Sequence, residues 1–215
     1  MVTPSSELTP RKSPLQARAL ATQEALHSAA IQVLIREGLV ACTTTRIAQK
    51  AGTSVGTLYQ YYPNRDALLA AVLEAHIGRV ADAIADMCLR LHGAELTEMA
   101  VGLVAAFLKI KLANADASKA LFAIAAERGG ADLVLNGNIR MAASITRMLT
   151  SASDAHFVDP AIAAVVALSS IVGSVRTVLE GYAPPGFEEL LEEQLVSLVS
   201  GYLWNEAVRE GNPKL

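Results

Sequence analysis

The sequence is poor in aromatic residues and in cysteine. Only 5% of its 215 residues are Phe, Trp or Tyr, and the two cysteines are Cys42 and Cys88. Two cysteines are too few for the disulfide framework of a small secreted domain. Runs of β-branched residues bounded by turn signals are also scarce, whereas alanine and leucine abound, and this composition favours an all-α fold. A chain of this length can form one large helical domain or two smaller ones.

A long hydrophobic run is also missing. The mean hydropathy is +0.35, and the longest uncharged run extends from Pro160 to Val175. This run is shorter than the roughly 20 apolar residues that a membrane-spanning helix needs. It also contains three serines and a glycine, so we interpret it as a buried helix. Nothing at the N-terminus is typical of a signal peptide, and we therefore expect a cytoplasmic location and no membrane partner.

Patterns typical of enzymes and metal sites are absent from the sequence. The four histidines, His27, His76, His92 and His156, are widely separated and form neither an HExxH motif nor a Cys/His cluster. No GxSxG motif, glycine-rich phosphate loop or dinucleotide-binding fingerprint occurs. We predict no catalytic residue, no metal and no cofactor. An enzyme on a helical scaffold is the more distant alternative.

Charge is unevenly distributed along the chain. The net charge of −3 and the pI of about 5.8 do not suggest that the whole chain binds nucleic acid. Residues 1–65, however, contain seven Lys or Arg and three Asp or Glu, a net charge of +4. Residues 66–215 contain eleven Lys or Arg and eighteen Asp or Glu, a net charge of −7. Such a division is expected when the N-terminal part of a protein meets phosphate.

Residues 43–62, TTTRIAQKAGTSVGTLYQYY, have the pattern of two short helices joined by a tight turn. Ile47 and Ala48 lie on one apolar face of the first helix, and the threonines before it offer N-cap hydroxyls. Gly52 can end that helix because glycine enters the left-handed conformation without a Cβ penalty. Ser54 can cap the second helix. The pattern indicates a helix-turn-helix, whose second helix lies in the DNA major groove; a plain helical hairpin is the alternative.

With its flanks, this segment resembles the tetracycline-repressor (TetR) family of bacterial transcriptional regulators. The resemblance covers about residues 20–80 and rests on IREG at 35–38 and TTTRIAQKAGTSVGTLYQYYPNRDALL at 43–69. It implies an all-α homodimer that binds a palindromic DNA operator, most often as a repressor, and is released by a small molecule. A constitutive or architectural DNA-binding protein without an effector is the alternative. The corresponding domains are a disordered basic arm at 1–14, a DNA-binding domain at 15–65 and a ligand-binding and dimerisation domain at 66–215.

The resemblance also implies which residues contact DNA. Gln60 is the best candidate for reading a base, because its amide can form two hydrogen bonds with adenine. Tyr59 and Tyr61 would bind phosphates through their hydroxyls, and Arg65 would add a charged phosphate contact. A solvated helix face is the alternative for each residue, and burial is the alternative for Val55. The implied DNA-contacting residues are Thr43, Thr44, Thr45, Arg46, Ser54, Val55, Gly56, Thr57, Tyr59, Gln60, Tyr61 and Arg65.

Start and stop signals predict about nine helices. The first helix starts near Pro14 and ends at Gly38, and a long helix capped by Asn64 runs from Arg65 to about Leu91. Five more helices are expected beyond Gly93. The breaks between them are predicted at 115–116, 129–130, 154–160 and 184–186.

The last two predicted helices suggest a dimer interface. The next-to-last helix is rich in small residues, which let two helix axes approach closely. The apolar residues of the last helix cover too wide a sector for a helix that packs on one side only. Both features fit an isologous four-helix interface between two subunits; a deeply buried pair inside a monomer is the alternative. The expected interface residues are Ala163, Ala167, Ser170, Gly173, Leu191, Leu195, Leu198 and Tyr202.

The effector implied by the resemblance would bind inside the C-terminal helices. Few charges occur there, so we expect a hydrophobic or amphipathic molecule. Arg176 could bind a ligand carboxylate, but an ion pair with Glu180 at i and i+4 is the alternative. Core packing is the alternative for the other candidates. The candidate pocket residues are Met87, Met99, Phe107, Phe122, Met141 and Arg176.

Overall fold

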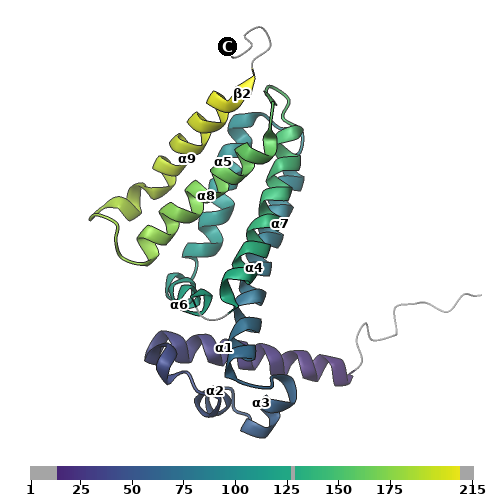
Figure 1. Ribbon diagram of the computed structural model, residues 1–215, viewed down its shortest axis with the longest axis vertical. Helices are drawn as coiled ribbons and strands as arrows, with labels where there is room; N and C mark the ends of the chain where they lie inside the picture. The colour runs from purple at the N-terminus through teal and green to yellow at the C-terminus, as the bar shows by residue number, and fades with distance from the viewer. Residues whose placement is uncertain (1–13, 127–128, 209–215) are drawn as a thin grey trace, which may run out of the picture. The chain divides into compact units, whose positions relative to one another are not determined.

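The computed structural model describes residues 14–126 and 129–208 (Figure 1). Within these ranges the protein has nine α-helices and two strands of two residues each, so the all-α prediction is confirmed. The expected N-terminal arm, including Arg11 and Lys12, lies outside the described residues. The elements are α1 (Pro14–Ala41), α2 (Thr44–Lys50), α3 (Val55–Tyr61), α4 (Arg65–Arg90), α5 (Leu96–Leu112), α6 (Ala115–Ala125), α7 (Gly130–Thr150), β1 (His156–Phe157), α8 (Pro160–Leu179), α9 (Phe187–Glu206) and β2 (Ala207–Val208).

The described residues form two compact units. Unit 1 ends at Val72 and unit 2 begins at Leu73. The first two turns of α4, which begins at Arg65, belong to unit 1. The remainder of α4 is part of unit 2.

Local signals in the sequence set the ends of the unit 1 helices. Gly38 has a φ of 77°, which interrupts the helical backbone of α1. The Thr43 hydroxyl accepts a hydrogen bond from the Arg46 backbone N–H at 3.3 Å and so caps α2. Asn64 caps α4 in the same way, through a 2.8 Å hydrogen bond from the Ala67 N–H. These assignments agree with the sequence prediction.

The core of unit 1 is formed where α1 packs on α2 and α2 packs on α3. Each short helix buries few residues: α2 buries Ile47 and Ala48, and α3 buries Leu58. Helix α1 adds a buried apolar stripe, and the start of α4 adds Leu68 and Leu69. Because so few side chains hold α2 and α3, their remaining faces are left open to solvent or to a partner.

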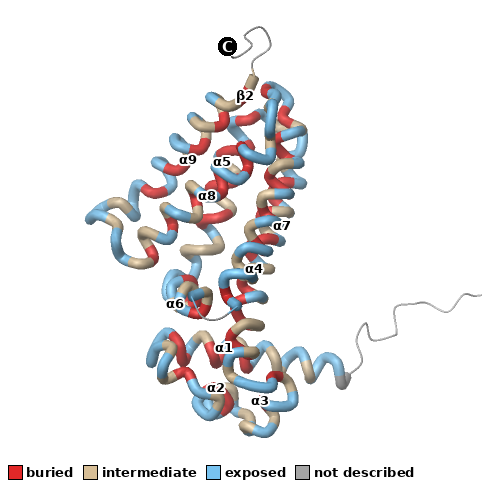
Figure 2. Tube along the Cα trace, in the orientation of Figure 1, coloured by how far each residue is buried: buried red, intermediate tan, exposed pale blue. Residues whose placement is uncertain are grey.

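Unit 2 is a helical bundle. Helix α7 packs on α8, α8 packs on α9, and α9 packs on α5, while the short α6 lies against α7 and α8 (Figure 1). The buried residues are concentrated on the sides of these helices that face one another (Figure 2). Of the helices the structure describes, α8 alone is long and apolar enough to cross a membrane, with a mean hydropathy of 1.9 and 39% of that stretch buried. A core helix meets the same criteria, so this is weak evidence for a membrane span.

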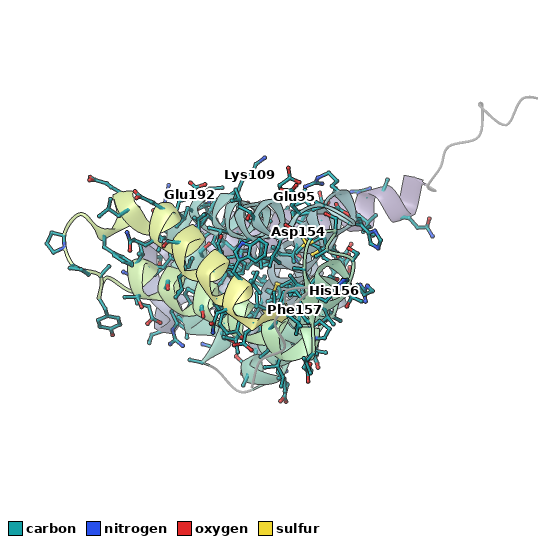
Figure 3. The ribbon with its side chains drawn as sticks, turned by 90° about the horizontal axis from the view of Figure 1, so that it is seen from above. Glu95, Lys109, Asp154, His156, Phe157 and Glu192 are labelled. Atoms are coloured by element: carbon teal, nitrogen blue, oxygen red, sulfur yellow. The ribbon has the colours of Figure 1, made fainter. Side chains whose placement is uncertain are left out.

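Contacts distant in sequence hold one end of unit 2 together. Helix α5 has no side-chain cap from its own N-cap residue, Glu95. Instead, the Asp154 carboxylate accepts a 2.8 Å hydrogen bond from the Leu96 N–H, and the two acidic residues lie at the same end of the bundle (Figure 3). Strands β1 and β2 pair antiparallel beside them, with His156 opposite Val208. The loop after α7 is therefore joined both to the start of α5 and to the end of α9.

The two cysteines are free thiols, one in each unit. Cys42 and Cys88 are both buried. Burial raises the pKa of each thiol to about 11, although nearby arginines oppose the shift. Both side chains are therefore protonated and unreactive at neutral pH.

Candidate nucleic-acid interface and effector cavity

Helix α3 presents a polar surface to its surroundings. Gly56, Tyr59 and Gln60 are exposed, whereas Leu58 on the opposite side is fully buried. The Ser54 hydroxyl caps the helix by accepting a 2.9 Å hydrogen bond from the Thr57 N–H. Its Oγ also lies 2.9 Å from the Thr57 hydroxyl, so both side chains are held at the start of α3. The implied base-reading residue, Gln60, is thus on the accessible face of a capped helix.

The exposed face of α3 includes a glycine that the fold does not require. A Cβ atom added to Gly56 would meet only the Ser54 Oγ, at 3.6 Å, which is an ordinary van der Waals contact. Glycine in a helix costs about 0.5–1 kcal/mol relative to alanine. Gly56 therefore leaves room next to the backbone on the surface that Gln60 occupies.

The start of α2 lies close to α3 through a contact between two side chains. The Tyr59 hydroxyl lies 3.4 Å from the Thr44 hydroxyl, and 51% of the Tyr59 surface is exposed. Thr45 is exposed and Thr44 is half-buried. The structure therefore brings the implied contact residues of α2 and α3 together on unit 1, with Tyr61 and Val55 half-buried at the edges of this surface.

The two arginines of the implied surface both have acidic partners. Arg46 forms an ion pair with Glu37 of α1, and Arg65 pairs with Asp66 at 2.8 Å. All four side chains are accessible to solvent to a considerable extent, so these ion pairs contribute little to stability. Each guanidinium can exchange its carboxylate for a phosphate at a small cost.

Unit 2 contains a cavity of about 70 Å³. It is bounded by α4, α5, α6, α7 and α8, and most of its lining is apolar. Among residues 14–126 and 129–208, the polar groups of its lining are one imidazole, one ammonium, one hydroxyl and one amide, and no carboxylate. The lining residues are Leu73, His76, Ile77, Val80, Phe107, Lys111, Ser118, Leu121, Phe122, Ala125, Val134, Asn138, Met141, Val172 and Val175.

The polar groups of the cavity interact with one another. Lys111 Nζ lies 3.1 Å from His76 Nε2 and 5.3 Å from the centre of the Phe122 ring. Burial lowers the pKa of the Lys111 ammonium to about 8. Burial, with the positive charges of Lys111 and Arg79, lowers the pKa of His76 to about 4. At neutral pH the imidazole is therefore uncharged and can accept a hydrogen bond from the ammonium.

The structure divides the candidate pocket residues into two groups. Phe107, Phe122 and Met141 line the cavity, whereas Met87 and Met99 lie in the core of unit 2 outside its lining. For the two methionines the structure supports the alternative, core packing, because their helical faces point into the packed interior. The Arg176 guanidinium lies 5.7 Å from the Phe122 ring and forms the predicted ion pair with Glu180, at 2.8 Å.

The two titratable residues of the cavity are absent from the sequence-based candidates. His76 lies four residues from the buried Val72 and Val80, and Lys111 lies four residues from the buried Phe107. A charged or titratable residue that continues an apolar helical stripe is the signal that could have identified both.

Four of the expected dimer residues face the interior of unit 2. Ala163, Ala167, Leu191 and Leu195 have at most 2% of their surface exposed within a single chain. Apolar residues occur on several sides of both helices, so their spacing alone does not show which side packs inward. The other four, Ser170, Gly173, Leu198 and Tyr202, are at least partly accessible.

The exposed apolar residues and glycines of α8 and α9 overlap the expected set only at Gly173 and Leu198. Ile162, Val165 and Val166 on α8 are 38–60% exposed, and Leu190 and Leu198 on α9 are 50% and 51% exposed. Gly173 and Gly201 lie on the same outer sides, and a Cβ at either would meet nothing within 4 Å. We call these seven residues the outer stripe. An apolar stripe with small residues on two adjacent helices is typical of a helix-packing surface.

Unit 1 and unit 2 together define a helix-turn-helix protein with a separate helical domain that contains a cavity. Family comparison agrees with this class: residues 26–72 match the family described as bacterial regulatory proteins, tetR family, and residues 95–203 match the family described as Tetracyclin repressor-like, C-terminal domain. The second match alone covers about half of the chain. The protein belongs to the tetracycline-repressor family.

A curated relative supports the assignment of the N-terminal part. The chain is 38% identical over 72 residues to YvdT of Bacillus subtilis (strain 168), an uncharacterized HTH-type transcriptional regulator. The match covers 34% of this chain and 36% of YvdT. The chain therefore matches about a third of the length of this relative.

Solved structures of low sequence identity share the fold. FadR of Bacillus halodurans, a fatty acid degradation regulator, is 16% identical with a TM-score of 0.64 over 83% of this chain and 97% of its own. SmeT, the repressor of the Stenotrophomonas maltophilia multidrug efflux pump SmeDEF, is 16% identical with a TM-score of 0.66 over 89% of this chain and 94% of its own. At such identities the likeness establishes the fold alone.

Proposed function

We propose that this protein is a ligand-responsive, DNA-binding transcriptional regulator that acts as a repressor. The observation that carries the proposal is the polar, exposed face of α3, which is held on a capped helix-turn-helix in a chain of the tetracycline-repressor family. Repression by SmeT, which shares the fold, supports the sign of regulation. A helix of this kind reads base edges in the major groove.

The contacts with DNA divide into base reading and backbone binding. Gln60 on the exposed face of α3 would read a base, and Tyr59 would bind a phosphate through its hydroxyl. Arg46 and Arg65 would exchange their acidic partners for phosphates. This division predicts different roles for the amide and the guanidinium groups, and it can be tested by substitution.

The outer stripe of α8 and α9 would join two subunits. Its apolar and small residues fit a symmetric four-helix interface, in which the same surface is used by both copies. Two-fold symmetry would place two α3 helices in successive major grooves. The operator would then be roughly palindromic, with half-sites about one helical turn apart.

The cavity in unit 2 would bind the effector. Leu73, His76 and Val80 of α4 line it, and the same helix contributes Leu68 and Leu69 to the buried core of unit 1. A ligand that binds better to one arrangement of α4 would shift the population of the DNA-binding state. Release of the operator by an effector follows from this coupling.

The small cavity volume favours one alternative, a regulator without an effector. A volume of about 70 Å³ is well below the roughly 300–1,000 Å³ of pockets that hold drug-sized ligands. One measurement distinguishes a regulator that has an effector from a regulator that has none. A small molecule that raises the melting temperature by several degrees and also releases DNA supports the effector, and the lack of both across a broad metabolite set supports the alternative.

Selection of bound sequences from a random DNA pool tests the proposed function. Once an operator is known, Gln60→Ala should relax base preference, whereas Arg65→Ala should weaken binding to all sequences and reduce the salt slope by about one. Equal effects of both substitutions on every sequence would contradict the division of roles. A protein that binds no duplex at low salt would overturn the proposal itself.

A further inference from the structure

The cavity of unit 2 contains a positive charge that pairs with no acidic side chain of the residues that the structure describes. The ammonium of Lys111 is close to His76 Nε2 and to the Phe122 ring, and no carboxylate is paired with it among residues 14–126 and 129–208. The Arg176 guanidinium contacts the same ring and is already paired with Glu180. A buried charge without a counter-charge is costly, and proteins normally pair such groups.

The groups around Lys111 hold the ammonium in place without neutralising it. The imidazole of His76 is uncharged at neutral pH and accepts one hydrogen bond, and the Phe122 ring adds a cation–π contact. Lys111 lies in the last turn of α5, where the helix dipole also favours a cation. Lys111 lines the cavity, so an anionic group that enters it could meet this charge.

The rest of the cavity is suited to a hydrocarbon group. Its remaining lining comes almost entirely from aliphatic and aromatic side chains, among them Phe107, Leu121, Met141 and Val175. The hydroxyl of Ser118 does not compete for the anion, because it donates a 2.7 Å hydrogen bond to the Lys111 carbonyl. The cavity thus combines one cationic group with an apolar wall, which selects an apolar acid over a neutral or a cationic molecule.

We propose that the unit 2 cavity binds a small apolar carboxylic acid, whose carboxylate pairs with the Lys111 ammonium and whose hydrocarbon part packs on the apolar lining. The role of this acid in regulation rests on the proposed function, but the binding of the acid to the cavity does not. A cavity of about 70 Å³ holds only a few heavy atoms, so longer acids bind only if lining side chains move.

The test measures binding to the full-length protein without DNA. Isothermal titration calorimetry with straight-chain monocarboxylates of four to ten carbons should show binding. Alcohols and primary amines of the same lengths should bind at least about tenfold more weakly, because they lack the negative charge that Lys111 requires. Equal affinities for acids and alcohols, or no binding of any acid, would overturn the proposal without the use of any variant.

A pair of lysines on one helix supplies the matched variants. Lys111→Met should lose about tenfold or more of the affinity for acids and keep the affinity for alcohols. Lys109→Met removes the same charge from an exposed position of α5 and should bind acids as the wild type does (Figure 3). If Lys111→Met folds and binds acids with wild-type affinity, the proposed pairing is refuted.

DNA release is measured separately, so that the two proposals can fail independently. Acids that bind through Lys111 but leave the operator complex intact would leave this inference standing and remove the effector step from the proposed function. Operator release by a neutral molecule, with no acid bound, would leave the proposed function standing and refute the inference.

Discussion

The Tyr62 hydroxyl lies 2.8 Å from His27 Nε2, which joins the residue after α3 to the middle of α1. The two rings are 5.9 Å apart between centres, and Tyr62 is 8% exposed. Burial raises the pKa of the Tyr62 hydroxyl, so the phenol is protonated and available as a donor. This contact anchors the C-terminal end of α3 to α1 and leaves the polar face of α3 exposed.

Tyr62→Phe should lower the free energy of unfolding by about 1 kcal/mol, because the hydrogen bond between the buried Tyr62 and the half-buried His27 is lost. Urea denaturation monitored by circular dichroism measures the effect. Tyr59→Phe is the matched control: its hydroxyl is exposed, so stability should stay within about 0.5 kcal/mol while DNA affinity falls. A larger stability loss for Tyr59→Phe would contradict the assignment of Tyr59 to the DNA surface.

Gly56→Ala should stabilise unit 1 by about 0.5–1 kcal/mol and weaken DNA binding, because its Cβ meets only an ordinary contact within the protein and lies on the side of α3 that we assign to the groove. Gly78→Ala in α4, where a Cβ meets nothing within 4 Å, should stabilise the protein similarly and leave DNA affinity unchanged. Fluorescence anisotropy with labelled operator gives the affinities. Unchanged affinity in Gly56→Ala would show that the DNA backbone does not approach this glycine closely.

Leu198→Glu should convert the proposed dimer to a monomer, since it places a charge at the centre of the outer stripe. Leu135→Glu is the control, because Leu135 is similarly exposed, at 57%, but lies on α7 outside the stripe. Sedimentation equilibrium reports the mass of each variant. If both variants keep the wild-type mass, the interface lies elsewhere or the protein is monomeric.

Acidification should destabilise unit 2 through His76. Its pKa is about 4 in the folded protein against 6.5 for an unperturbed imidazole, so the unfolded chain binds more protons between these values. Stability from this group is complete above pH 6.5 and is lost as the pH falls toward 4, by on the order of 2–3 kcal/mol. The nearby groups, Lys111 and Arg79, are cationic throughout this range.

Thermal unfolding of the wild type and of His76→Gln between pH 4 and pH 7 measures this contribution. Carboxylates elsewhere in the protein affect both proteins alike, so the difference between the two curves isolates the imidazole. Parallel curves for the two proteins would mean that His76 is solvated enough to titrate normally in the folded state.

The helix-turn-helix could be predicted from the sequence because its signals are local. Thr43, Ser54 and Asn64 each cap a helix through a backbone N–H three residues ahead, and Gly52 adopts a φ of 68° at the turn. Such relationships depend on neighbouring residues only. For the same reason the limits of α1 to α4 agree closely with the predicted ones.

The cavity and the outer stripe depend on packing between distant segments. His76 and Lys111 are 35 residues apart, and only the packing of α4 against the neighbouring helices brings them together. On α8, Ala163 and Ala167 are buried while Ile162 and Val166 are exposed, which is the reverse of what hydrophobicity alone would suggest. Small residues fill the tight inner contacts, and larger ones lie on the accessible side of the helix. Strands β1 and β2 are too short to produce a pattern in the sequence.

The two buried thiols can report separately on the local opening of unit 1 and of unit 2. An alkylating reagent modifies a thiolate, and Cys42 and Cys88 ionise only where local opening exposes them to water. Because one belongs to unit 1 and the other to unit 2, the rate at which each is labelled in the natural sequence measures how often that unit opens. Mass spectrometry of the labelled peptides, with and without operator DNA or a carboxylic acid, would then show which unit the DNA rigidifies and which unit the acid rigidifies.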